Sequence, residues 1–162
     1  MARQIRPSMF ETNSSSAHAL IVIGNDNYEK RLDSFKIANN KIIATPGGFG
    51  WNNPTLVTPN EKLAYVLTVI TRIFNDEEVA TEEELSGTKF TLLSEAIKDY
   101  TGYELAYKPL NDKYHPNGYI DHQSDDLLDE YFYGVSNEKF KDNMKELIFN
   151  NKYSIDIDND NH

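Results

Sequence analysis

The chain has 162 residues, of which 39% are hydrophobic and 12% aromatic, and its formal net charge is −10. This apolar content is enough for a folded core and excludes general disorder, and no apolar run approaches the roughly 20 residues that span a bilayer. The excess of acidic side chains disfavours non-specific binding to DNA or RNA, because it repels phosphates at long range.

The composition also bears on compartment and partners. The chain has no cysteine, and no apolar segment follows the basic residues Arg3 and Arg6, so we expect a cytoplasmic protein without a secretory signal or membrane anchor. The net charge has two interpretations: it keeps the protein soluble, which is the simpler one, or it suits docking on a basic surface of another protein. Without repeats or low-complexity linkers, residues 1–162 are expected to form a single globular domain.

Hydrogen-bonding side chains are concentrated in residues 10–18, directly before an apolar run. Their hydroxyls and backbone N–H groups are of the kind that hold phosphate or carboxylate oxygens. Ser16 and His18 project from the same face of an extended chain, which makes them a candidate nucleophile–base pair. The alternative, which the residues alone favour, is that this segment only turns the chain into the strand and His18 is a satisfied histidine at the core edge. The candidate ligand-binding residues here are Glu11, Asn13, Ser14, Ser15, Ser16 and His18.

The next segments predict strands. Residues 19–23 are a continuous, largely β-branched apolar run that ends at Gly24, which is typical of a buried strand followed by a turn. Residues 35–37 and 41–44 flank an Asn-Asn pair and predict a short hairpin. Residues 45–54, rich in glycine and proline, are expected to form a loop.

The first predicted helix has the clearest signals. Thr58 is suited to the cap, Pro59 to the first helical position, and Glu61 completes a capping box. Apolar residues then recur at helical spacing and predict one buried stripe, formed by Leu63, Val66, Leu67, Ile70, Ile73 and Phe74. A second helix is expected from Thr88 to Gly102, followed by a strand over residues 103–107.

A second polar cluster lies at residues 120–124. Its adjacent Asp121 and His122 suggest a proton relay or a metal ligand pair, although neighbouring residues of a strand point to opposite faces. The alternative is a helix N-terminus that Ser124 caps. Asp121, His122, Gln123 and Ser124 are added to the ligand-binding candidates, and the catalytic candidates are His18, His122, Asp121 and Ser16. The sequence identifies no cofactor and no metal site.

The last third predicts a short helix that opens at Ser124, a longer one capped by Ser136, and a strand over residues 153–157. Alternating acidic residues follow, and Asp156, Asp158 and Asp160 have two interpretations: ligands for a hard cation, or an acidic tail that frays from residue 156. We predict the frayed tail. The order of elements predicts an α+β fold with a short mixed or antiparallel sheet packed with about four helices.

With these residues in view, the chain resembles an uncharacterised family of small proteins that are frequent in bacteriophage genomes and also occur in Firmicutes. The resemblance rests mainly on residues 5–18, IRPSMFETNSSSAH, and is supported by residues 119–124 and by residues 147–150 with 158–160. It implies a phage or prophage gene product that acts in the bacterial cytoplasm. It implies no mechanism, but it does imply that the separate motifs belong to one site.

Two hypotheses of function follow. The first, slightly preferred, is an acidic accessory protein that binds a host bacterial protein, and its motivation is the acidic stretches at residues 76–78, 82–84 and 125–130. The second is a small enzyme or ligand-binding domain for a nucleotide or another phosphate-containing ligand. In it the two polar clusters meet in one cleft, and His18 or His122 acts as general base.

Overall fold

The computed structural model of the chain describes residues 3–7, 16–49, 55–71, 74, 78–120 and 128–159. Its helices are α1 Pro59–Thr71, α2 Glu82–Ser86, α3 Phe90–Thr101, α4 Asp129–Phe132 and α5 Asn137–Phe149, with a 3₁₀ turn η1 Leu32–Ser34. Its strands are β1 Arg3–Pro7, β2 Ser16–Ile23, β3 Ile37–Ala38, β4 Lys41–Ala44, β5 Gly48–Phe49, β6 Thr55–Leu56, β7 Glu104–Tyr107, β8 Tyr119–Ile120 and β9 Tyr153–Asn159.

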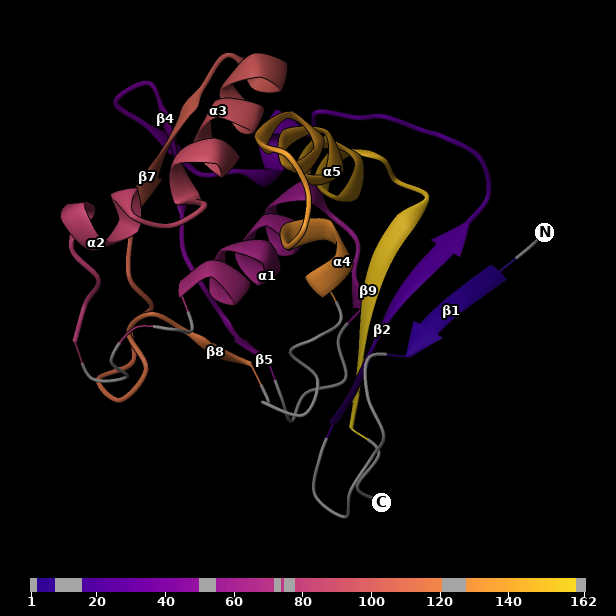
Figure 1. The fold of residues 1–162 in the computed structure, drawn as a ribbon, viewed down its shortest axis with the longest axis horizontal. Coiled ribbons are helices and arrows are strands. Elements are labelled where there is room, and N and C mark those ends of the chain that lie inside the picture. The colour runs from indigo at the N-terminus through magenta and orange to yellow at the C-terminus, as the bar shows by residue number, and fades with distance from the viewer. Residues whose placement is uncertain are drawn as a thin grey trace.

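These elements form the α+β fold that the sequence predicts, but the strands are divided among three small sheets, with the orders β1-β2-β9-β6, β3-β4-β7 and β5-β8. Figure 1 shows the long strands β1, β2 and β9 on one side of the molecule and α2, β4 and β7 on the other. Helices α1 and α5 lie between them. Among the described residues, no helix has the length and apolar character needed to cross a membrane.

The four-stranded sheet is antiparallel and joins both ends of the chain. β2 pairs with β9 from Ser16 opposite Asn159 to Val22 opposite Tyr153. The strand predicted over residues 153–157 is confirmed and is longer than expected. The prediction of a tail that frays from residue 156 is therefore wrong for residues 156–159, because pairing with β2 holds them in the sheet; residues 160–162 lie outside the described residues.

The predicted hairpin is confirmed as β3 and β4. Asn39 and Asn40 have φ angles of 52° and 61°, which are the left-handed conformations of a two-residue hairpin turn. β4 then pairs in parallel with β7, so α1, α2 and α3 belong to the connection that crosses between them. This arrangement leaves β7 at one edge of its sheet.

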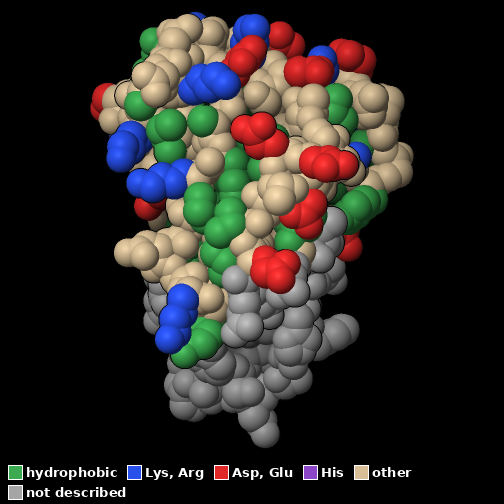
Figure 2. Space-filling model, turned by 90° about the vertical axis from the view of Figure 1, so that its left-hand side faces the viewer, with side chains coloured by type: hydrophobic (Ala, Val, Ile, Leu, Met, Phe, Trp, Pro, Cys, Tyr) green, Lys and Arg blue, Asp and Glu red, His purple; other side chains and the backbone are tan. Residues whose placement is uncertain are grey.

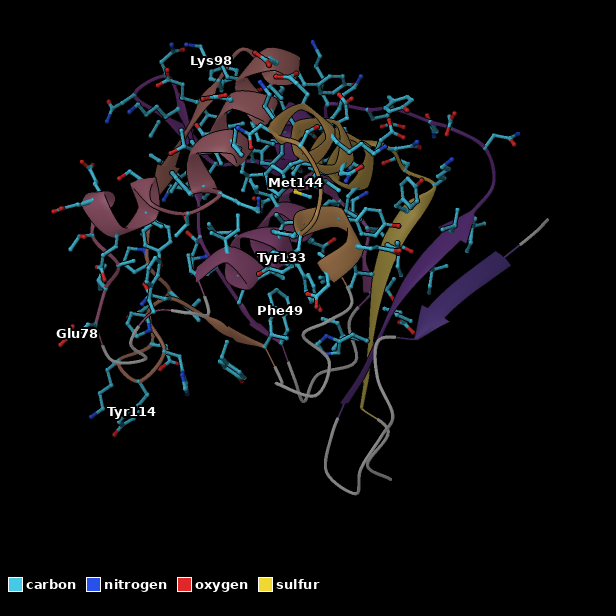
Figure 3. The ribbon with its side chains drawn as sticks, viewed as in Figure 1. Phe49, Glu78, Lys98, Tyr114, Tyr133 and Met144 are labelled. Carbon is cyan, nitrogen blue, oxygen red and sulfur yellow. The ribbon has the colours of Figure 1, made fainter. Side chains whose placement is uncertain are left out.

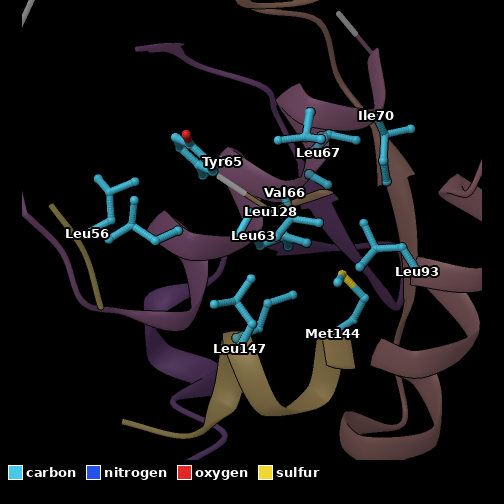
Figure 4. Packing of buried hydrophobic residues seen from close by; sticks show 14 of the residues in the cluster. Leu56, Leu63, Tyr65, Val66, Leu67, Ile70, Leu93, Leu128, Met144 and Leu147 are labelled. Carbon is cyan, nitrogen blue, oxygen red and sulfur yellow. The ribbon is translucent and has the colours of Figure 1, made fainter. Parts of the chain in front are cut away.

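Helix α1 is the centre of the core. Its predicted capping box is present: Glu61 N–H donates to Thr58 Oγ1 at 3.2 Å and Thr58 N–H donates to Glu61 Oε1 at 3.0 Å. Figure 4 shows how its apolar side chains pack against Met144 and Leu147 of α5 and Leu93 of α3. The packed side chains that α1 contributes include Leu63, Val66, Leu67 and Ile70.

The burial of α1 exceeds the single stripe that the sequence predicts. The helix is enclosed on nearly all sides, and Lys62, Tyr65, Thr68 and Thr71 are all fully buried. Each of these polar groups meets another element: Thr68 Oγ1 accepts from Gly47 N–H at 2.9 Å, and Thr71 Oγ1 donates to the Asn117 carbonyl at 2.7 Å. Polar side chains on a buried helix thus fix the loops around it.

The remaining differences from the sequence predictions concern short elements. α2 was not expected, because a five-residue helix with one buried residue, Leu85, has no recognisable apolar stripe. Strand β5 lies within residues 45–54, which were predicted to form a loop, and pairs with β8; the sequence also did not predict β1. Ser136 caps α5 and Gly102 ends α3, as expected. The predicted helix start at Ser124 lies outside the described residues.

Candidate functional site

Most of the predicted site residues lie outside the described residues; these are Glu11, Asn13, Ser14, Ser15, Asp121, His122, Gln123 and Ser124. Ser16 is described by its backbone alone, as the first residue of β2 opposite Asn159. His18 is the candidate whose side chain the structure places. The convergence of the two polar clusters therefore stays a prediction.

The His18 imidazole is fully buried on the inner side of β2. Its Nδ1 lies 2.8 Å from the Tyr65 hydroxyl of α1, and the two rings meet edge-on at 5.7 Å between centroids. Figure 4 shows Tyr65 on the opposite side of α1 from Met144 and Leu147. The imidazole is thus positioned by a hydrogen bond from the central helix, a bond that ties the four-stranded sheet to the core.

The described flanks of both polar clusters come together around Tyr65. The centroid of the Phe49 ring lies 5.0 Å from that of Tyr65, and Phe49 is paired with Ile120, the first residue of the second cluster. In Figure 3, Phe49 lies below α1, on the side where β5 and β8 run. A continuous set of contacts therefore leads from His18, at the end of the first cluster, to the start of the second.

A buried ammonium lies one turn before Tyr65 on the same helix. Lys62 is fully buried, and its Nζ donates to the backbone carbonyls of Tyr153 at 2.9 Å and Asn150 at 3.3 Å. Burial lowers the pKa of Lys62 to about 8, because removal from water disfavours the charged form. Asn150 directly follows α5 and Tyr153 begins β9, so Lys62 holds the junction of α5 and β9 against α1.

A separate surface feature, which we call the α2–β7 groove, lies between α2, the start of α3 and the edge strand β7. It has a volume of about 400 Å³. Val79, half exposed, stands on its wall, whereas Leu85 and Leu105 are buried at its base. The larger apolar side chains that line it are Val79, Leu85, Phe90, Leu105, Tyr107 and Pro109.

Asn117 fixes the wall of this groove. Its side chain is 2% exposed, and its amide bonds to several groups around it. Its Oδ1 accepts from Ala80 N–H at 2.9 Å and from the Tyr107 hydroxyl at 2.7 Å, and its Nδ2 donates to the Glu78 carbonyl at 2.6 Å. The segment that carries Val79 is therefore attached to β7 through one buried amide.

Charged side chains stand on either side of the groove. Glu82 of α2 and Lys41 of β4 both line it. Figure 2, which faces the side of the molecule that carries α2, shows hydrophobic side chains in a central band, with lysine or arginine gathered on one flank and acidic side chains on the other. Within the groove, burial raises the pKa of Tyr107 to about 12, so its hydroxyl stays neutral and remains a donor to Asn117.

Sequence reasoning did not find the groove. Its walls come from residue 41, residues 79–91 and residues 105–109, which no spacing rule brings together. The available sequence signal was the acidic run at residues 82–84, which did suggest a binding surface; the exposure of Val79 beside it is seen only in the structure. Comparisons with protein-family models, with curated proteins and with solved structures find no match. Among the described residues, no group of three or more His, Cys, Asp or Glu side chains is placed to hold a metal ion.

Proposed function

We propose that this chain acts by contact, as an accessory protein that binds another protein through the α2–β7 groove. The observation that carries the proposal is the groove itself, in which an exposed valine and buried leucines are bordered by charges of both signs. Apolar surface rimmed by charged residues is typical of protein-binding sites, because burying it stabilises a complex and the charges select the partner.

The net charge of −10 indicates the kind of partner. An acidic surface accelerates association with a basic surface and disfavours acidic ones. The resemblance to phage-associated proteins extends the proposal: the chain is a phage or prophage product, and its partner is a basic host protein of the bacterial cytoplasm.

The proposal is tested with a charge placed in the groove. Val79→Asp puts a carboxylate on the apolar wall, and Val57→Asp is the matched control, because the two valines are 50% and 51% exposed and Val57 does not line the groove. Each variant is used to capture partners from bacterial lysate, and the affinity for the captured protein is then measured. We expect Val79→Asp to weaken binding at least tenfold, roughly the effect of losing one buried apolar contact.

The control is expected to bind as the natural chain does, and binding is expected to weaken with added salt. Equal affinity for all three chains would contradict the groove as the binding surface. If the natural chain captures no partner at either low or high salt, the contact function itself is wrong.

A second function, a ligand-binding or enzymatic site at the polar clusters, is supported by the contacts that run from His18 through Tyr65 and Phe49 to Ile120. These contacts are consistent with Ser16, His18, Asp121 and His122 sharing one cleft. The test is a pair of variants, His18→Ala and His122→Ala, studied by melting temperature and by binding of nucleotides and inorganic phosphate. A shared site predicts that both lose ligand binding, whereas structural roles predict a loss of melting temperature alone.

A further inference from the structure

The open edge of β7 runs along the groove. Lys108 N–H donates to the Ala44 carbonyl across the parallel ladder at 2.9 Å, so alternate backbone groups of β7 face β4 and the others face away. The Leu105 N–H faces away from β4 and donates a hydrogen bond to Ser94 Oγ of α3 at 3.1 Å. By the same alternation the Leu105 carbonyl and the Tyr107 N–H face the open side. Among the described residues, no strand pairs with this edge.

The lining of the groove shows that the groove follows this edge. Leu105, Ala106 and Tyr107 are consecutive and all line it. Their side chains alternate between the two faces of the sheet, so a groove that contacts all three runs along the edge of the strand. Across the groove, Val79 on the wall and Leu85 at the base supply apolar surface for side chains of whatever lies against the edge.

The charges beside the edge select what can bind there. Helix α2 carries three exposed carboxylates, Glu82, Glu83 and Glu84, of which Glu82 reaches the groove. Glu84 accepts from Thr81 N–H in the capping box, which holds the acidic turn in place. A lysine or arginine next to an apolar residue complements this wall, and the net charge of −10 draws such a segment from a distance.

From these observations we infer that the α2–β7 groove binds an extended, basic segment of a partner protein, which adds as a strand to the edge of β7. Its main chain pairs with the Leu105 carbonyl and the Tyr107 N–H. Its apolar side chains lie against Leu85 and Val79, and a lysine or arginine lies beside Glu82. In strand addition the main chain supplies affinity and the alternate side chains supply specificity. This inference rests on the proposed function and specifies the segment that the groove recognises.

The test uses a synthetic peptide of about eight residues, within the usual length of a strand, in which lysine and valine alternate. It is titrated into the ¹⁵N-labelled full chain and followed by amide chemical shifts. We expect shifts at residues 105–107 and 82–86. A peptide of the same sequence with N-methyl groups on the alternate amides facing β7 is expected to bind at least tenfold more weakly, because its donors are removed.

Two variants test the charge. Glu82→Lys is expected to lower the affinity for the peptide about tenfold. Glu83 is on the same helix but does not line the groove, so Glu83→Lys is expected to lower that affinity far less. A peptide in which glutamate and valine alternate is expected not to bind. Equal binding of the N-methylated peptide, or shifts confined to α3 and α5, would overturn strand addition.

This outcome is separable from that of the proposed function. If no peptide binds at β7 but Val79→Asp still lowers the affinity for the captured partner, the contact function stands and strand addition is wrong. If Val79→Asp leaves partner binding unchanged while the lysine–valine peptide binds at β7 as described, the groove has the inferred chemistry and the captured partner uses another surface.

Discussion

At the scale of single residues, buried polar groups hold the candidate sites in place. Asn117 bonds the segment at residues 78–80 to Tyr107, and His18 bonds β2 to Tyr65. A paired buried polar side chain contributes little to the free energy of unfolding, but removing it leaves its partners buried without a hydrogen bond. Variants of these residues are therefore expected to lower the free energy of unfolding strongly, even where the substitution changes the side-chain volume little.

The first prediction concerns Asn117→Ala. The substitution leaves Ala80 N–H, the Tyr107 hydroxyl and the Glu78 carbonyl without the partner that Asn117 supplies. We expect the free energy of unfolding to fall by at least about 3 kcal/mol, since each such loss costs about 1–3 kcal/mol. Urea unfolding measures it. The control Tyr107→Phe removes only the bond from the Tyr107 hydroxyl and is expected to cost about 1 kcal/mol. A cost equal to that of Asn117→Ala would contradict the assignment.

The second prediction concerns pH. The folded-state pKa of Lys62 is about 8, below its ordinary value of 10.5, so between these values the unfolded chain binds more protons than the folded chain. The free energy of unfolding of the natural chain should therefore rise with pH across this window, relative to Lys62→Met, by about 3 kcal/mol in total.

The comparison with Lys62→Met is needed because other groups titrate nearby. Burial raises the pKa of Tyr107 to about 12, and this group lowers stability as the pH rises above 10. The difference between the two chains cancels this contribution. Parallel stability profiles of the two chains from pH 8 to 10.5 would show that folding does not lower the pKa of Lys62.

At the scale of elements, side-chain caps mark where α1 and α5 begin. Ser136 accepts a hydrogen bond from Lys139 N–H at 3.1 Å at the start of α5. The third prediction is that Ser136→Ala lowers the free energy of unfolding by about 1 kcal/mol, whereas Ser136→Asp, which keeps the cap, changes it by less. Thermal unfolding of both variants is the measurement. Equal losses for both would contradict a capping role.

These caps also explain how much of the fold the sequence predicts. The starts of α1 and α5, the end of α3 at Gly102 and the turn at Asn39 and Asn40 depend on neighbouring residues, so their signals are local. The acidic helix α2 depends on Leu85 alone for burial, and the two-residue strands β5 and β8 depend on each other. The capping box of Thr81 and Glu84 is a local signal for the start of α2, but without an apolar stripe it does not distinguish so short a helix from a turn, and the two-residue strands carry no pattern at all.

The candidate sites show the same limit. His18 was singled out because it ends a polar run, but its partner Tyr65 lies 47 residues away and outside the predicted apolar stripe of α1. The α2–β7 groove combines three separated segments, and its shape follows from the parallel pairing of β4 with β7. Parallel pairing depends on long-range packing, so sequence spacing alone does not predict the groove.

At the scale of the whole molecule, the long antiparallel sheet and the α2–β7 groove lie on opposite sides of the central helices (Figure 1). The proposed contact surface is thus separate from the side on which His18 is buried. The fourth prediction follows: His18→Ala lowers the melting temperature but leaves the affinity for a partner bound in the groove unchanged in the fraction that remains folded. A loss of that affinity larger than about threefold, at a temperature where the variant is folded, would contradict the separation of the two sites.

The central claim, that the groove is the contact surface, is tested most directly by photocrosslinking in bacterial cells. A photoreactive phenylalanine analogue replaces Val79 in one chain and Val57 in another, two positions of equal exposure. We predict that position 79 yields a discrete crosslinked protein, that Glu82→Lys suppresses it, and that position 57 yields none. Crosslinks of equal yield from both positions, or from position 57 alone, would contradict the claim.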